Sequence, residues 1–393
     1  MRTDTHRARV QRQQGAVAVL RYVHANPGAT RADVTHALGL SSGSTADIVA
    51  RMKRLRVLTE TDAPPSGERG RPSPRLVPHT HGPLVCAVDI SHERWEVALT
   101  ELGGNVVDEM SGPHTSRRPA DMLGELRDPI EAAHRRHPRR LGAVSVAVAG
   151  TVRGTEIVEA SGLRWRDVSL EMLRPRPDLP LLVTNDATLA GVAEARRGAG
   201  RQARVVLHLL VAVGVGGVLV VDGNPVDGAT GAGGEFGHLP FADPSQSCPC
   251  GAYGCWDLEV GGRAMARVLG QRAPRNPRTR AEQLIARAST DPAARAAVES
   301  TARALGRGIG GLVNALDPEI VTLSGLAADL TRVAPATLDS AYRRALMRFH
   351  RAQAPPLMPS TLEPNSQLTG ATDIGFDALL TPDGIETWTR RAA

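Results

Sequence analysis

Apolar positions in the first part of the chain recur at the spacing of amphipathic helices. Residues 16–26 keep this spacing until Pro27-Gly28 interrupts it, and 30–39 follow as a short helical stretch. Thr30 is a suitable N-cap for this second helix, and Gly39 is a suitable stop at its end. The pattern therefore predicts two helices joined by a tight turn.

A third helix is predicted directly afterwards, with Ser41 or Ser42 as its N-cap. Its apolar positions fall on one face, at Ile48, Val49, Met52 and Leu55. Residues 56–61 and 74–79 then predict the two strands of a hairpin. Three helices followed by a hairpin are the order of a winged helix-turn-helix, a module that places one helix in the DNA major groove.

Beyond residue 82 the pattern changes to β-rich runs that alternate with helical stretches. Strands are predicted at 84–90, 96–102, 106–110, 140–150, 180–186, 203–223 (as a pair) and 319–325, and helices at 120–137, 187–198, 303–318 and 334–350. Such alternation is typical of an α/β fold. A group of strands near the start of each half indicates two related lobes, and ligands of such folds bind in the cleft at the strand ends.

The length of 393 residues is too great for one small domain. A segment rich in proline, glycine and polar residues at 61–82 separates the two patterns, so we expect one domain over 1–80 and another over 81–393. The first carries thirteen arginine and lysine residues against six acidic ones, and the second carries 34 against 35. A basic excess confined to the N-terminal fifth favours a polyanionic partner, with a basic solvated surface as the alternative.

Two further features of the sequence bear on its cellular environment. No run of about 18 apolar residues occurs, and the first residues lack the apolar core of a secretory signal. We therefore expect a cytoplasmic protein without a membrane partner. Cys86 stands alone in an apolar run and is expected to be a buried strand residue.

The third helix and the hairpin supply candidate DNA contacts. Small polar side chains at the start of a recognition helix can reach base edges, and basic side chains contact phosphates. The candidates on the helix are Ser42, Ser44, Thr45, Arg51 and Lys53. Arg69 and Arg71 lie at the predicted tip of the wing and suit a narrow minor groove. The alternative is a three-helix dimerisation module, which the order, spacing and charge of this region disfavour.

Three of the four cysteines cluster with a histidine in the loop 238–255. His238, Cys248, Cys250 and Cys255 follow the spacing H-x9-C-x-C-x4-C, and glycines between them allow tight turns. Three thiolates and an imidazole suit one tetrahedral Zn²⁺ per chain, with a structural role because no position stays open to water. Buried or redox-active thiols without a metal are the alternative.

Four segments together resemble the ROK family (repressor, open reading frame, kinase). They are the strand-turn-strand from Val85, VTNDATLAGVAEA at 183–195, GATGAGGEFGHLPF at 228–241 and CPCGAYGCWD at 248–257. The resemblance covers nearly the whole chain and implies an actin-like, hexokinase-type fold of two lobes. The N-terminal winged helix-turn-helix is similar to that of the family's transcriptional regulators, including the xylose and N-acetylglucosamine repressor types.

The resemblance also implies a zinc site at the four residues of the cysteine cluster, and a sugar site beside it. The residues that would face the hydroxyls of a monosaccharide are Asn185, Asp186, Glu235, His238 and Asp257. The residue types fit, because carboxylates accept hydrogen bonds from hydroxyls and an amide both donates and accepts. Two positions depart from the family pattern: Asp257 replaces a glutamate, and Gly162 stands where asparagine is frequent. The alternative for the Asn185-Asp186 pair is a strand-to-helix turn in which Asp186 caps the following helix, and both roles can coexist.

In kinases of the family, the residue at Asp186 is the general base that deprotonates the attacking sugar hydroxyl. The first phosphate motif, D-x-G-x-T, is changed here, with Ser91 in place of the glycine and Glu93 in place of the hydroxyl residue. The second, G-T-G-x-G-G, reads AVGVGG at 212–217, and the segment LSGLAADL keeps one glycine of the usual pair or triplet. These departures predict that Asp186 is a vestigial base and that ATP-dependent turnover is absent.

We therefore expect a DNA-binding transcriptional regulator of carbohydrate metabolism, a repressor, whose second domain senses a sugar or sugar derivative. Its partners would be this effector and a palindromic double-stranded operator, bound by a homodimer or homotetramer. Two alternatives stay open: a sugar kinase that carries a DNA-binding head, and a regulator that needs no small ligand.

Overall fold

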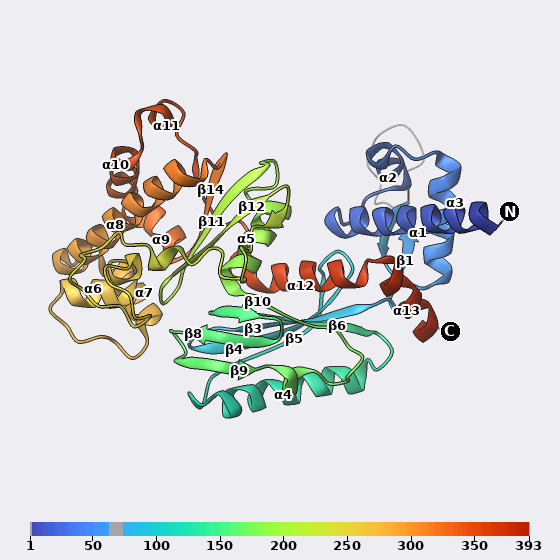
Figure 1. Ribbon diagram of the computed structural model, residues 1–393, viewed down its shortest axis with the longest axis horizontal. Helices are drawn as coiled ribbons and strands as arrows, with labels where there is room; N and C mark the ends of the chain where they lie inside the picture. The colour runs from blue at the N-terminus through green and yellow to red at the C-terminus, as the bar shows by residue number, and fades with distance from the viewer. Residues whose placement is uncertain (1, 63–73, 393) are drawn as a thin grey trace.

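The computed structural model describes residues 2–62 and 74–392, which form a small N-terminal head beside a larger two-lobed body (Figure 1). The head contains α1 (Arg2–Ala25), α2 (Arg31–Leu38) and α3 (Ser42–Arg54), and then the antiparallel pair β1 (Leu58–Thr61) and β2 (Arg75–Pro78). This is the predicted order of three helices and a hairpin. The predicted wing contacts Arg69 and Arg71 lie outside the described residues.

Local sequence signals set the ends of α2 and α3. The Thr30 hydroxyl accepts from the Asp33 amide, and the Asp33 carboxylate accepts from the Thr30 amide, which forms a capping box. Gly39 ends α2 in the left-handed conformation at φ 60°. The Ser41 hydroxyl accepts from the Ser44 amide, so Ser41 is the N-cap of α3.

One expectation about α3 is wrong, because Thr45 does not face solvent. Its side chain is 1% exposed, and its hydroxyl accepts from Oγ1 of Thr35 on α2 at 3.0 Å. The same hydroxyl donates to the carbonyl of Ser41 at 3.2 Å. These two partners allow a polar group to pack between the helices. Thr45 is therefore a packing residue of the α2–α3 turn and is withdrawn as a DNA contact.

The first lobe of the body is built on a five-stranded sheet in the order β10-β6-β3-β4-β5. Its strands are β3 (Leu84–Ile90), β4 (Arg94–Glu101), β5 (Val106–Pro113), β6 (Leu141–Val148) and β10 (Leu181–Asn185). Helix α4 (Pro119–Arg136) covers one face, and α12 (Ser366–Leu379) covers the other (Figure 1). A smaller sheet and a 3-10 helix complete the lobe: β7 (Thr151–Arg153), β8 (Glu156–Ala160), β9 (Trp165–Ser169) and η1 (Glu171–Leu173). Cys86 is fully buried in β3, as predicted.

The second lobe contains a sheet in the order β13-β12-β11-β14-β15. Its strands are β11 (Val205–Val211), β12 (Val215–Val221), β13 (Asn224–Pro225), β14 (Ile320–Gly325) and β15 (Leu357–Pro359). Helix α5 (Asp186–Arg196) packs against β11 and β12. The other helices are η2 (Phe236–His238), η3 (Trp256–Leu258), α6 (Gly262–Val268), α7 (Pro277–Arg287), α8 (Pro292–Leu316), α9 (Leu326–Val333), α10 (Pro335–Ala345) and α11 (Arg348–Ala352). The predicted two-lobed α/β fold is thus confirmed. In the described ranges, no helix combines the length and apolar character that crossing a membrane requires.

The single helix predicted over 334–350 is wrong, since α10 and α11 are separated at Leu346 and Met347. Leu346 has extended backbone angles, φ −70° and ψ 137°, and its side chain is buried in the core of the second lobe. The amide of Met347 donates to Oδ1 of Asn314 at 3.0 Å. The buried side chain of Leu346 and the hydrogen bond of Met347 with Asn314 of α8 therefore interrupt the helix between α10 and α11.

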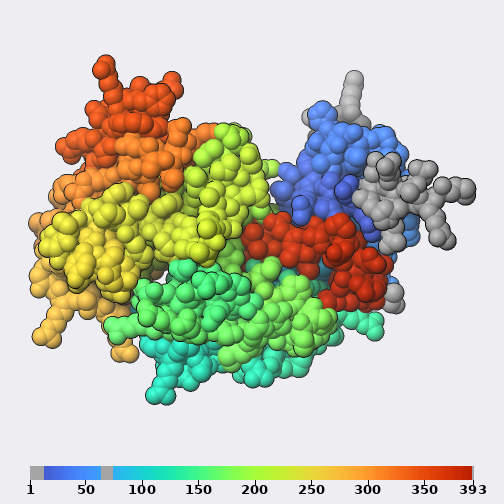
Figure 2. Space-filling view, viewed as in Figure 1, coloured from blue at the N-terminus to red at the C-terminus, as the bar shows by residue number. Residues whose placement is uncertain are grey.

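The head shares its hydrophobic core with the C-terminal helix α13 (Pro382–Ala392). Nε1 of Trp388 donates to the carbonyl of Leu55, the residue that ends α3, at 2.8 Å. Phe376, Leu380 and Ile385 join Trp388 in one buried cluster with the apolar faces of α1 and α3. Figure 2 shows the red C-terminal segment against the blue head. The division of the chain between 1–80 and 81–393 stays a prediction, and this core packs the two parts together.

Candidate functional site

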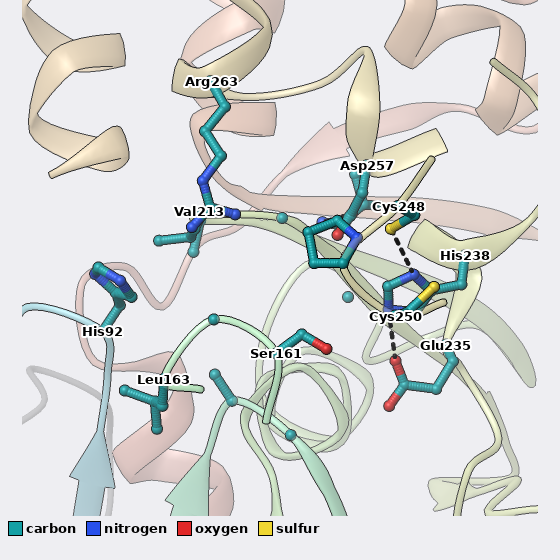
Figure 3. Close-up of a pocket in the computed structure, with 18 of the residues that line it drawn as sticks. His92, Ser161, Leu163, Val213, Glu235, His238, Cys248, Cys250, Asp257 and Arg263 are labelled. Atoms are coloured by element: carbon teal, nitrogen blue, oxygen red, sulfur yellow. Dashed lines mark hydrogen bonds and ion pairs between the residues drawn. The ribbon is translucent and has the colours of Figure 1, made fainter. Parts of the chain in front are cut away.

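The cleft between the two lobes holds a cavity of about 510 Å³ (Figure 3). Its walls come from the turn after β6, the start of α5, the glycine-rich turn 212–217 and the loop 235–257. The structure places all five predicted sugar contacts along this one cavity: Asn185, Asp186, Glu235, His238 and Asp257. Segments far apart in the sequence thus bring together a set of polar side chains that can form hydrogen bonds with hydroxyls.

Asn185 and Asp186 stand where β10 ends and α5 begins. Oδ1 of Asn185 accepts from the Thr188 amide, so Asn185 is the N-cap of α5, and the expectation that Asp186 is the cap is wrong because Asp186 is already the first residue of the helix. Nδ2 of Asn185 donates to the carbonyl of Gly150 at 3.2 Å. The Asp186 carboxylate accepts from the amide of Ala187 at 2.8 Å. Burial raises the pKa of Asp186 to about 6. The nearby Glu235 carboxylate also raises this pKa, whereas the hydrogen bond from the Ala187 amide lowers it. Asp186 therefore changes its charge close to neutral pH.

Glu235 and His238 connect the cavity to the cysteine cluster. Oε1 of Glu235 accepts from the hydroxyl of Thr151, a first-lobe residue, at 2.8 Å. Nε2 of His238 is 3.9 Å from Oε2 of Glu235 (Figure 3). Nδ1 of the same ring is 3.9 Å from Sγ of Cys248. The imidazole thus presents one nitrogen to the acidic side of the cavity and the other to the cysteines.

The four predicted metal ligands lie together. Their ligand atoms are all within 4.8 Å of one another, and Sγ of Cys250 is 3.7 Å from Sγ of Cys255. An ion held by thiolates at about 2.3 Å in a tetrahedron separates its ligand atoms by about 3.8 Å. The closest pairs of the cluster match that spacing. His238, Cys248, Cys250 and Cys255 could therefore hold a metal ion.

Asp257 is tied to the glycine-rich turn instead of projecting freely into the cavity. Its Oδ1 accepts from the amide of Val215 at 2.5 Å. The Asp257 carboxylate packs closely between two glycines. A Cβ atom added to Gly214 would lie 2.5 Å from Oδ2 of Asp257, and one added to Gly237 would lie 2.3 Å from Oδ1, so neither position has room for a side chain. Burial raises the pKa of Asp257, although the Val215 amide opposes the rise. The backbone occupies one carboxylate oxygen, so the other is the atom left for a ligand.

The first phosphate-type motif makes contacts within the protein. Oγ of Ser91 donates to the carbonyl of Arg94 at 2.8 Å and closes the β3–β4 turn. Glu93 in this turn connects the lobes, since its Oε2 accepts from the hydroxyl of Thr279 on α7 at 2.8 Å. Its Oε1 is buried without a hydrogen-bond partner among the described residues. Ser91 and His92 of this turn line the cavity, whereas the Glu93 carboxylate contacts α7.

The remaining predicted DNA contacts that the structure describes lie along α3. Ser42 and Ser44 are exposed at its start, and Arg51 is half-buried in its last turn. Lys53 is exposed, and its Nζ lies 2.7 Å from Oε2 of Glu60 on β1. A DNA phosphate would therefore compete with Glu60 for Lys53, whereas the two serines are free of such an ion pair.

The cleft residues that were not predicted from the sequence include Thr151, His92, Arg263 and Thr279. Thr151 directly follows Gly150 and a buried strand, and this position at a strand end is a usable signal for a ligand site. Arg263 of α6 and Thr279 of α7 give no such signal, because only tertiary packing brings their helices to the cleft. His92 lines the cavity beside them, and burial together with the nearby Arg117 lowers its pKa to about 4. Its ring is neutral at pH 7.

Comparison with known families adds the deciding observation: the model of the ROK family matches residues 85–377. The chain belongs to the ROK family. A glucokinase of Streptomyces coelicolor is 28% identical to this ROK protein over 322 residues, which are 77% of this chain and 99% of the relative. The xylose repressor of Bacillus subtilis is 22% identical over 370 residues, which are 92% of this chain and 94% of the relative.

A solved structure extends the likeness of this ROK protein to the head. It is a ROK family transcriptional regulator described as a homolog of the E. coli MLC protein, and it superposes with a TM-score of 0.75 at 21% identity. The superposition covers 96% of this chain and 98% of the other. The head and the body together therefore have the fold of that regulator.

Proposed function

We propose that this ROK protein is a DNA-binding transcriptional repressor of carbohydrate metabolism that responds to a sugar or sugar derivative. The observation that carries the proposal is the joining of a helix-turn-helix head to a cleft lined by hydroxyl-binding side chains. The match of the Bacillus subtilis xylose repressor over 92% of this chain supports it. The head would read the operator, and the cleft would bind the effector.

The sugar contacts follow from the chemistry of the cavity. Asn185 can donate to and accept from a hydroxyl, and the carboxylates of Asp186 and Glu235 can accept from two adjacent hydroxyls. Nε2 of His238 faces the same space on the Glu235 side. Asp257 contributes through the oxygen that the Val215 amide leaves unused. In this role Asp257 also fixes the glycine-rich turn against the ligand.

We propose that the cysteine cluster holds one structural Zn²⁺ per chain. Three sulfur ligands and one nitrogen ligand are a donor set that zinc prefers, and the short separations support it. When bound, the ion cross-links the loop 235–257. His238, bound through Nδ1, then keeps a fixed ring orientation and directs Nε2 toward Glu235 and the effector.

The second candidate function is a sugar kinase that carries a DNA-binding head. Asp186 favours it, because a carboxylate with a pKa of about 6 at the start of α5 suits a general base. Glu93 and Asp257 speak against it. Glu93 places a negative charge in the β3–β4 turn, where it would repel a nucleotide phosphate. Asp257 accepts from the amide of Val215 in the glycine-rich turn, so this amide is not available to a phosphate. We therefore propose a regulator without ATP-dependent turnover.

Contacts with DNA are proposed for six polar and basic positions of the head. On α3 these are the exposed Ser42, Ser44 and Lys53, together with the half-buried Arg51. The sequence-predicted wing contacts Arg69 and Arg71, outside the described residues, are proposed as well. A homodimer or homotetramer would present two heads to a palindromic operator, with half-sites about one helical turn or a multiple apart. Basic side chains would supply salt-dependent affinity, and the serines would reach base edges.

An effector should weaken operator binding at least tenfold. Operator fragments are selected from genomic DNA with the full chain, and their affinity is measured by fluorescence anisotropy. The panel contains glucose, xylose, N-acetylglucosamine and their phosphates. Glu235→Gln should bind the operator normally and weaken the response, because it replaces a proposed hydroxyl-binding carboxylate and leaves the helix cap at Asn185 in place. Unchanged operator affinity across the panel would contradict the repressor proposal, and sugar phosphorylation abolished by Asp186→Asn would establish the kinase instead.

Effector affinity should fall in acid through Asp186. Its raised pKa of about 6 means that the carboxylate is protonated below this pH and can no longer accept from two hydroxyls. We expect the association constant to be level above pH 7 and to fall by up to about tenfold per pH unit below 6. Titration calorimetry between pH 5 and 8 measures this. Asp186→Asn serves as the pH-independent control, and a level wild-type profile would refute the assignment.

A further inference from the structure

Arg197, the residue directly after α5, joins three parts of the molecule. Its Nε donates to Oδ1 and Oδ2 of Asp373 at 2.9 and 3.0 Å, and its Nη2 donates to Oδ1 at 2.6 Å. Its Nη1 donates to the carbonyl of Gly103 at 3.2 Å. Asp373 belongs to α12, and Gly103 belongs to the β4–β5 turn of the first lobe. One guanidinium thus connects the end of α5 to α12 and to the first lobe.

His24 of α1 brings the head into the same cluster. The amide of Gly103 donates to Nδ1 of His24 at 2.9 Å. Nε2 of the same ring lies 2.9 Å from Oδ1 of Asp373 and 2.9 Å from Nη2 of Arg197, so His24 contacts both partners of the ion pair. His24 is 6% exposed and Asp373 is 2% exposed. Burial alone would raise the pKa of Asp373, but the hydrogen bonds from His24 and Arg197 hold it below its usual value. A buried carboxylate requires its partners to stay in place, because an unpaired buried charge is strongly destabilising.

Helix α5 leads from the effector cavity to this cluster. It begins at Asp186 in the cavity wall, and its 11 residues span about 16 Å. The helix is fixed to the second lobe, since a Cβ on Gly191 would lie 2.2 Å from Cγ1 of Val218. It also meets α12 at the backbone, where a Cβ on Gly370 would lie 2.0 Å from the Leu189 carbonyl. This contact falls between the two ends of α5 and can serve as a pivot.

We propose that Arg197 transmits the state of the cleft to the DNA-binding head, an inference that rests on the proposed effector-responsive repressor. A ligand that draws the lobes together turns α5 about its contact with α12, so the ends at Asp186 and Arg197 move in opposite directions. Arg197 then shifts against Asp373 and Gly103. Because His24 shares both of these partners, α1 and the head are repositioned. Arg197 lies outside the lining of the cavity and outside α3, so we treat it as a positioning residue.

The test compares two neighbouring arginines. Arg196 also pairs with α12, through Asp377 at 2.7 Å, and it donates to the carbonyl of Gly223, but no hydrogen bond or ion pair of the described residues joins it to the head. Operator affinity is measured by anisotropy with and without the panel sugar that acts most strongly on the wild-type chain. Arg197→Gln should reduce a tenfold or larger sugar effect to less than twofold. Arg196→Gln should keep the wild-type effect.

Further measurements separate a positioning role from loss of folding. Sugar affinity of the DNA-free protein, measured by calorimetry, should stay within threefold of wild type in both variants. The double variant Arg197→Gln/Asp373→Asn removes both charges of the ion pair. It should lose the sugar effect on operator affinity to the same extent as Arg197→Gln, and it should still unfold in a cooperative thermal transition. An undiminished sugar effect in Arg197→Gln overturns the inference and leaves the repressor proposal standing. If no sugar of the panel releases the wild-type chain from DNA, both the inference about Arg197 and the repressor proposal are overturned.

Discussion

Replacing Cys255 with serine should remove the metal from the protein and abolish effector binding. Elemental analysis should find about one zinc ion per wild-type chain and almost none in the variant. A structural zinc site contributes roughly 10–16 kcal/mol of apparent binding free energy, which is as large as the net stability of many domains. Without it the loop 235–257 cannot hold Glu235 and His238 at the cavity. We expect sugar affinity, measured by calorimetry, to fall at least a hundredfold.

Loss of the metal should also destabilise the hydrophobic core of the second lobe. Trp256 follows Cys255, and its Nε1 donates to the carbonyl of Ala304 on α8 at 3.0 Å. The ring lies so close to α8 that a Cβ on Gly308 would come within 2.1 Å of it. The thermal midpoint of Cys255→Ser should therefore drop together with its metal content.

The matched control is Cys86→Ala, since Cys86 is buried in β3 outside the cluster. This variant should lose some stability through the cavity that it creates and should keep its zinc. Wild-type protein purified under reducing conditions without a stoichiometric metal would contradict the zinc proposal. Full metal content in Cys255→Ser would contradict the assignment of that ligand.

Trp388→Ala should destabilise the head and weaken operator binding, although Trp388 lies more than 300 residues from α3 in the sequence. The change removes a buried side chain from the core of the head and its hydrogen bond to Leu55. Truncation of a buried tryptophan costs about 3–5 kcal/mol. We expect faster hydrogen exchange in α1 and α3 and at least a tenfold loss of operator affinity. Sugar affinity should stay within about twofold, because the cavity is remote.

Two variants on α13 sharpen this test. Arg390 is exposed, and its Nη2 donates to the hydroxyl of Thr387 on the same helix. Arg390→Ala should therefore change the free energy of unfolding by less than about 0.5 kcal/mol. Trp388→Phe keeps most of the packing and loses the Nε1 donor, with an expected cost of about 1 kcal/mol. Unaltered exchange and DNA affinity in Trp388→Ala would show that the head folds without α13.

Most elements could be predicted because their signals are local. Periodicity and caps identified α2 and α3, and long apolar runs identified the central strands of both lobes. The cysteine cluster could be predicted for a similar reason, since its four ligands fall within eighteen consecutive residues and the chain needs only tight turns to bring them together.

Features that depend on distant partners could not be predicted in this way. Thr45 has the polarity of a surface residue, and its burial follows from the hydroxyl of Thr35 on the neighbouring helix. The break at Leu346 depends on Asn314, more than thirty residues away. In the sequence, Glu93 stands out only as a departure from the phosphate motif. In the structure, its carboxylate accepts a hydrogen bond from Thr279 and so connects the two lobes. In each case the deciding atom belongs to an element that the local pattern cannot specify.

The shared core of α1, α3 and α13 has a consequence for the order of synthesis. The apolar faces of α1 and α3 leave the ribosome when more than 300 residues remain to be added before α13 can cover them. At about 5–20 residues per second this interval lasts roughly 15–65 s. A prematurely terminated chain would carry the three helices but lack the tryptophan that completes their packing. Under the proposed function, operator binding would therefore be confined to polypeptides that also contain the sugar-sensing body.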